Sequence, residues 1–165
     1  MRLLLTVAVS IGFLTPSTLA FQARGRAAAT TSSVRACALL TRDLIRKVTP
    51  YEGKALDIAL TGAPEEDSLG AGGSDCSDGG IAIQIDPRFT FETFKRQKGW
   101  ENAEHVTVGD EALFHDNIGE WAELVVRSGS HLLTIRMDIP RGKTAASIKP
   151  NVIALAKAIL PAILR

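Results

Sequence analysis

The sequence has no excess of charge of either sign and is poor in aromatic residues. Its 19 basic and 18 acidic residues nearly cancel, so it lacks the basic footprint of nucleic-acid-binding proteins and of proteins drawn to anionic lipid. Aromatic residues make up only 5% of the chain, which argues against a platform for stacking bases or sugars. We therefore expect no nucleic-acid partner.

Long apolar runs are also scarce, and the one that stands out is N-terminal. Arg2 precedes the run Leu3–Leu14. Pro16 then breaks the run, and Ala20 supplies the small residue that a signal peptidase accepts. The segment is typical of a secretory signal peptide over residues 1–20 and is too short for a membrane span. A buried N-terminal helix is the alternative.

Cleavage near Ala20 would leave 145 of the 165 residues, which suits a single domain. No later run reaches the ~18 apolar residues that a membrane helix needs, so we expect no membrane span after cleavage. No cysteine stands at the cleavage site to receive a lipid. We expect an exported, periplasmic or secreted, soluble protein; an uncleaved signal acting as an anchor is the alternative.

Cysteine occurs only twice, as Cys37 and Cys76. In an exported protein, two cysteines are most simply used as one intramolecular disulfide. Neither stands in a Cys-x-x-Cys motif, as reactive thiols often do, and together they fall short of a four-ligand zinc site. We predict a Cys37–Cys76 disulfide; two free thiols would contradict it.

Apolar periodicity predicts an α+β domain over residues 34–165, after a flexible lead-in over 21–33. The expected elements are, in order, a helix from Ser33 to Val48, strands over Ala55–Thr61 and Ile81–Ile85, a short helix after Pro87, strands over Glu111–Asp116, Glu120–Arg127 and Ser130–Ile139, and a helix over Thr144–Leu164. The Gly-, Ser- and acid-rich stretch Gly62–Gly80 is expected to be a long loop. Because short hairpins join the later strands, we expect an antiparallel sheet of about five strands with helices on one face.

Several short motifs resemble a family of small exported actinobacterial domains of unknown function, many of them lipoproteins. They are the Cys-x-Leu-Leu helix start at Cys37, the later Cys76, the segments Gly109–Phe114 and Leu124–Gly129, and the Leu/Ala-rich helix around Ala154–Lys157. The resemblance implies a disulfide-bridged domain and no catalytic residues. The sequence departs from that family by lacking the lipidated cysteine and by its glycine-rich surroundings of Cys76.

Motifs that carry catalysis are missing as well. No serine stands in a Gly-x-Ser-x-Gly elbow, and the glycine-rich stretch near Gly70 lacks the Gly-Lys-Ser/Thr ending of a phosphate loop. The acidic residues around Cys76 match a calcium loop poorly and favour a solvated loop instead. Asp110, after Gly109, is interpreted as a turn residue whose carboxylate accepts hydrogen bonds from backbone amides.

Two tryptophans and two histidines are the remaining candidates for a site. Trp100 and Trp121 are either core residues or anchors of a binding surface. His115 and His131 are either separate strand-end residues or, with Asp116, the centre of an envelope hydrolase or metal-dependent enzyme. We expect a non-enzymatic envelope domain that binds a protein or a small ligand without a cofactor; the enzyme is the alternative.

Overall fold

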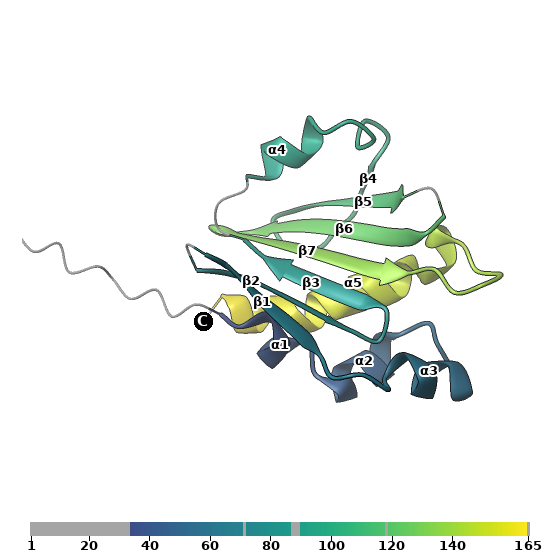
Figure 1. Cartoon of the computed structure of the whole chain (residues 1–165). Coiled ribbons are helices and arrows are strands. Elements are labelled where there is room, and N and C mark those ends of the chain that lie inside the picture. The colour runs from purple at the N-terminus through teal and green to yellow at the C-terminus, as the bar shows by residue number, and fades with distance from the viewer. Residues whose placement is uncertain (1–33, 71, 87–89, 118, 165) are drawn as a thin grey trace, which may run out of the picture. The chain divides into compact units, whose positions relative to one another are not determined.

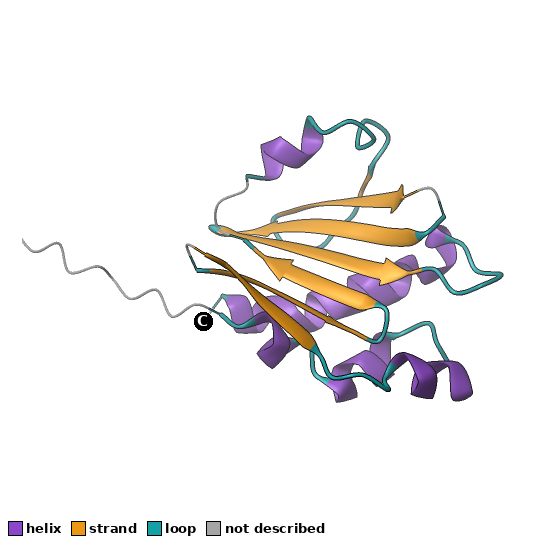
Figure 2. Ribbon diagram, in the orientation of Figure 1, coloured by secondary structure: helices purple, strands orange, loops and turns teal. Residues whose placement is uncertain are grey.

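The computed structural model describes residues 34–70, 72–86, 90–117 and 119–164. The expected signal peptide and lead-in lie outside these residues. Thr31–Arg165 is one compact unit, and its described part is α+β, built on a seven-stranded antiparallel sheet. Figures 1 and 2 show this sheet with helices beside it.

The sheet runs in the order β1-β2-β3-β7-β6-β5-β4. Its strands are β1 (Glu65–Gly70), β2 (Gly73–Asp78), β3 (Ile81–Ile85), β4 (Glu104–His105), β5 (Glu111–Asn117), β6 (Trp121–Ser128) and β7 (His131–Asp138). The helices are α1 (Ala36–Leu39), α2 (Arg42–Val48), α3 (Lys54–Ala59), α4 (Phe91–Lys95) and α5 (Ala145–Ile163). The predicted strands β3, β5, β6 and β7 and the closing helix α5 are confirmed.

Alternation along the strands gives the sheet two distinct faces. One face carries the main core, where Leu124, Ile135 and Ile83 pack with the buried stripe of α5. A capping box between Thr144 and Ser147 starts α5. By length and composition alone α5 could cross a membrane, but core helices pass the same test, and this helix packs against β6 and β7.

The opposite face is partly covered, which corrects the expectation that helices lie on one face only. Phe91 of α4 and Trp100 of the following loop join Leu113, Val125 and Leu132 in a second apolar cluster. These three strand residues alternate with those of the main core, so they point to the other side of the sheet. Figure 1 shows α4 on the side of the sheet away from α5.

The first expected helix is two helices, and the first expected strand is a helix. Thr41 interrupts the helix, because its side chain accepts a hydrogen bond from the Leu44 amide and starts α2. Leu56 of α3 and Leu60, which caps its C-terminus, lie four residues apart on one side and are partly and fully buried, whereas Ile58 is 70% exposed. The alternation of Leu56, Ile58 and Leu60, which predicts a strand, therefore comes from a helix in which Leu56 and Leu60 share the buried face and Ile58 is exposed.

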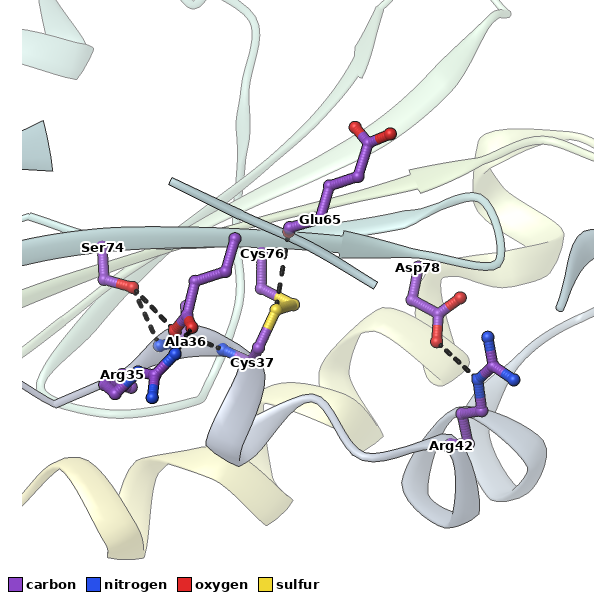
Figure 3. The surroundings of a disulfide bond; sticks show 9 residues. Arg35, Ala36, Cys37, Arg42, Glu65, Ser74, Cys76 and Asp78 are labelled. Carbon is purple, nitrogen blue, oxygen red and sulfur yellow. Dashed lines mark hydrogen bonds and ion pairs between the residues drawn. A yellow bond between two sulfur atoms is a disulfide. The ribbon is translucent and has the colours of Figure 1, made fainter. Parts of the chain in front are cut away.

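The expected loop over Gly62–Gly80 is the hairpin β1–β2. This hairpin and the short β4 add three strands to the four that were predicted correctly, which gives seven. The hairpin's polar residues are buried against the N-terminal helices because each has a specific partner (Figure 3). Cys76 forms the predicted disulfide with Cys37, with Cα atoms 5.0 Å apart. The Ser74 hydroxyl accepts a hydrogen bond from the Ala36 amide at 3.0 Å.

Candidate binding site

A pocket of about 440 Å³ opens at the end of the sheet where β1 begins and β7 ends. Cross-strand pairing aligns Glu65, Ser77, Ala82 and Arg136 in one row on the face opposite α5. The two middle side chains are small, so they leave a hollow between the larger ones at the ends of the row. The lining residues are Ala59, Gly62, Ala63, Glu65, Ser77, Asp78, Gly79, Gly80, Ile81, Ala82, Trp121, Arg136 and Asp138.

Trp121 is the aromatic wall of this pocket. It starts β6, is the cross-strand partner of Asp138 on β7, and is only partly buried. The Arg136 guanidinium lies 5.9 Å from the centre of its ring, within the range of a cation–π contact. Its Nε1 atom is buried and has no hydrogen-bond partner among the described residues.

Two of the charges that line the pocket are neutralised by ion pairs. Arg136 Nε donates to Glu123 Oε1 at 3.1 Å. Asp78, whose side chain is 2% exposed, accepts from Arg42 Nε at 3.1 Å. The remaining lining carboxylates, Glu65 and Asp138, have no ion-pair partner in the described part of the chain, so the pocket has a net negative charge.

Asp138 is held close to a tight turn and an aromatic ring. Gly80 has a φ of +74°, and a Cβ atom there would lie 2.9 Å from Asp138 Oδ2 and 3.3 Å from Tyr51 Cε2. Desolvation raises the pKa of the Asp138 carboxyl. Desolvation and, secondarily, the Asp138 charge raise the pKa of the Tyr51 phenol. The site thus contains an unpaired carboxylate that is still exposed but has lost part of its hydration to its neighbours.

A smaller hollow of about 50 Å³ adjoins the pocket on the same face and shares Ala82 and Arg136 with it. It is lined by Asp75, Ala82, Ile83, Gln84, Thr134 and Arg136. Asp75 lies directly opposite Asp67 across β1 and β2, and its Oδ1 atom is buried without a hydrogen-bond partner in the described residues. Like charges in this arrangement repel, so the hairpin β1–β2 holds two carboxylates close together beside this hollow.

Trp100 and His115 lie elsewhere, in and beside the second apolar cluster. Trp100 is 8% exposed, and its ring stacks on that of His115 with the centroids 5.0 Å apart and the planes at 19°. Of the two tryptophans, only Trp121 therefore lines the pocket.

The structure does not bring His115, His131 and Asp116 together. His115 is paired with Glu123 of β6, and His131 with Ser128 of the same strand. Five positions along a strand span roughly 17 Å. The Asp116 carboxylate accepts a hydrogen bond from the Gly119 amide at 3.0 Å, and the described residues contain no group of three or more His, Cys, Asp or Glu suited to a metal ion.

The predicted turn role of Asp110 is confirmed. Its Oδ2 atom accepts a hydrogen bond from the Gly129 amide at 2.7 Å, and its own amide donates to the Arg127 carbonyl at 2.9 Å. This bond pair joins the start of β5 to the turn between β6 and β7. Asp110 therefore serves the architecture of the hairpins.

Of the residues that line the pocket, the sequence points to Trp121 but not to Glu65, Ser77, Arg136 or Asp138. The first two of these four lie in the stretch that is expected to be a loop. The last two had a signal: they alternate with the apolar residues of β7, which places them together on the opposite face.

Comparisons with known proteins provide no relative whose binding site could be compared with this pocket. No family model, curated protein or solved structure matches the chain. The site is therefore described from its own chemistry alone.

Proposed function

We propose that this protein is a non-enzymatic domain exported to the cell envelope, where it binds a protein or a small ligand at the pocket beside Trp121. The observation that carries the proposal is the 440 Å³ hollow itself, with an indole in its wall. Ligand sites typically have volumes of about 300–1,000 Å³ and combine apolar surface with a few polar groups. Tryptophan is also among the residues that most often anchor binding partners.

Two features support the location. The Cys37–Cys76 disulfide is typical of proteins that fold outside the reducing cytoplasm. The charged start and apolar run of residues 1–20 are typical of an export signal. Cell fractionation and the mass of the mature protein test this part: a cytoplasmic protein with two free thiols would contradict it.

The two tryptophans make the binding test specific. In protein labelled with 5-fluorotryptophan, ¹⁹F NMR gives one resonance from Trp121 in the pocket and one from Trp100 in the second apolar cluster. A fragment library of mixed charge is then titrated. We expect binding fragments to shift the Trp121 resonance and to leave Trp100 in place; the variant Trp121→Phe assigns the signals.

If fragments shift only Trp100, or none shifts either resonance, the pocket is not the binding site. The enzyme hypothesis has its own readout. Stoichiometric zinc in the purified protein, lost in a His115→Ala/His131→Ala variant, would overturn the binding-domain proposal. So would turnover of an ester, peptide or glycoside substrate that the same variant abolishes.

A further inference from the structure

We propose that the pocket beside Trp121 accepts an organic cation, an ammonium or guanidinium group on a short alkyl stem. This inference rests on the proposed function and specifies the ligand of the same site. It stands on the shape of the pocket, on its aromatic wall and on the ion pairs around it.

Arg136 is the one cationic side chain among the described residues that line the pocket, and it is already neutralised. Arg136 donates to Glu123, so it offers little net charge to an incoming anion. Glu65 and Asp138 line the pocket from opposite sides of the small residues Ser77 and Ala82, and neither has an ion-pair partner among the described residues. A cation between them would be attracted by two carboxylates, whereas an anion would be repelled.

The surrounding face extends this preference beyond the pocket. Glu65, Asp67 and Asp75 lie on the same side of the hairpin β1–β2, and Arg136 is the only Lys or Arg within the four strands β1, β2, β3 and β7. A face of one sign attracts oppositely charged ligands from a distance.

The walls suit an alkyl stem. Ala59 and Ala63 line the pocket together with the Trp121 indole, so methylene groups would contact apolar atoms. The indole already has one cation near it, since the Arg136 guanidinium lies 5.9 Å from its centre. Aromatic rings attract cations through their π-electron faces, and here an indole lies in the same pocket as two unpaired carboxylates.

The test uses matched probes of one size and three charges: n-butylammonium, n-butanol and butanoate. The readout is the ¹⁹F resonance of Trp121 in the full mature protein, with Trp100 as the internal reference. We expect n-butylammonium to shift Trp121 saturably and to bind at least about tenfold more tightly than n-butanol, because two carboxylates face it. Butanoate should give no saturable shift.

Single substitutions identify which carboxylates are responsible for binding n-butylammonium. Asp138→Asn and Glu65→Gln should each weaken n-butylammonium binding by about fivefold to tenfold. The control Asp43→Asn changes net charge equally, but its side chain is 91% exposed on α2, outside the pocket lining, and it should alter binding less than twofold. Equal losses in all three variants would mean that only overall charge matters, which would overturn the inference.

A second pair of probes distinguishes a free amine from a protein side chain. A blocked Gly-Gly-Lys-Gly-Gly peptide is compared with 1,4-diaminobutane, and the acetyl-lysine form of the peptide is the neutral control. If either cationic probe binds more tightly than the acetylated peptide, the inference is supported. The tighter of the two cationic probes shows whether the ligand is a protein side chain or a free amine. If the acetylated peptide, n-butanol or butanoate binds at Trp121 as tightly as the cations, the cation inference fails and the proposed function survives. If nothing shifts Trp121, both fail.

Discussion

Cys37 of α1 and Cys76 of β2 are covalently joined, with Cα atoms 5.0 Å apart and a sequence separation of 39. Next to this bond, the Glu66 carboxylate accepts hydrogen bonds from Arg35, from the Cys37 amide and from the Ser74 hydroxyl. Arg35 is the main reason that the pKa of Glu66 is lowered. The bridge therefore holds the hairpin β1–β2, which forms one wall of the pocket, against the N-terminal helices (Figure 3).

Opening the disulfide should cost a large part of the protein's stability. The chain-entropy relation for a loop of this length gives about 4 kcal/mol. Urea unfolding in the presence of a reductant should show a loss of this size. A Cys37→Ala/Cys76→Ala variant should show a similar loss and no further response to reductant. An unchanged unfolding midpoint after verified reduction would contradict the prediction.

Arg42 should contribute more to stability than its neighbour Arg46. Arg42 pairs with Asp78, whose side chain is 2% exposed, and also donates to the Gly62 carbonyl. The variant Arg42→Ala leaves a buried carboxylate without its cation and should cost about 2 kcal/mol. Arg46 pairs only with the exposed Asp43, so Arg46→Ala should change the free energy of unfolding by less than about 0.5 kcal/mol. Equal effects in urea unfolding would show that the Asp78 pair has no special weight.

Gly109 should tolerate a side chain far less well than Gly142. Both have a positive φ, +62° and +80°, but a Cβ at Gly109 would lie 2.5 Å from Val126 Cγ1 and 2.7 Å from the Arg127 carbonyl oxygen, whereas Gly142 has nothing within 4 Å. Gly142→Ala should cost about 1 kcal/mol for the left-handed backbone alone. Gly109→Ala should cost about 3 kcal/mol because the strand must also shift. Thermal unfolding of the two variants makes the comparison, and equal losses would remove the steric argument.

The apolar part of the fold could be predicted from the sequence because its periodicity is strong. Ile81, Ile83 and Ile85 alternate along β3, and Ile148, Val152 and Leu155 form the buried stripe of α5. The six-residue α3 is too short for the pattern alone to separate helix from strand. The pattern therefore predicts a strand where the structure has this helix.

The hairpin β1–β2 could not be predicted in this way because its buried residues are polar. Ser74, Cys76 and Asp78 alternate as a strand should, and all three are buried. Their burial depends on partners far away in the sequence, namely Ala36, Cys37 and Arg42. The candidate site was missed for the same reason, since Glu65 and Ser77 belong to this hairpin.

Replacing Asp138 with asparagine should stabilise the protein at neutral pH and have less effect in acid. Desolvation raises the pKa of Asp138 in the folded protein, so the folded state favours the protonated form. Its charged form therefore costs stability above the folded-state pKa, and this cost disappears as the pH falls below the unfolded-state value of about 3.9. The titratable neighbour Tyr51, whose pKa is also raised, stays neutral across this range.

Urea unfolding of the parent protein and of Asp138→Asn at pH 7 and at pH 3 measures the effect. We expect the variant to be the more stable of the two at pH 7 and the difference to shrink toward zero at pH 3. The control Glu52→Gln removes an exposed carboxylate from the loop before α3 and should give no such trend. If the variant is less stable than the parent protein at pH 7, the Asp138 carboxylate has a stabilising partner in the folded state. A carboxylate that already has such a partner would bind a cationic ligand poorly.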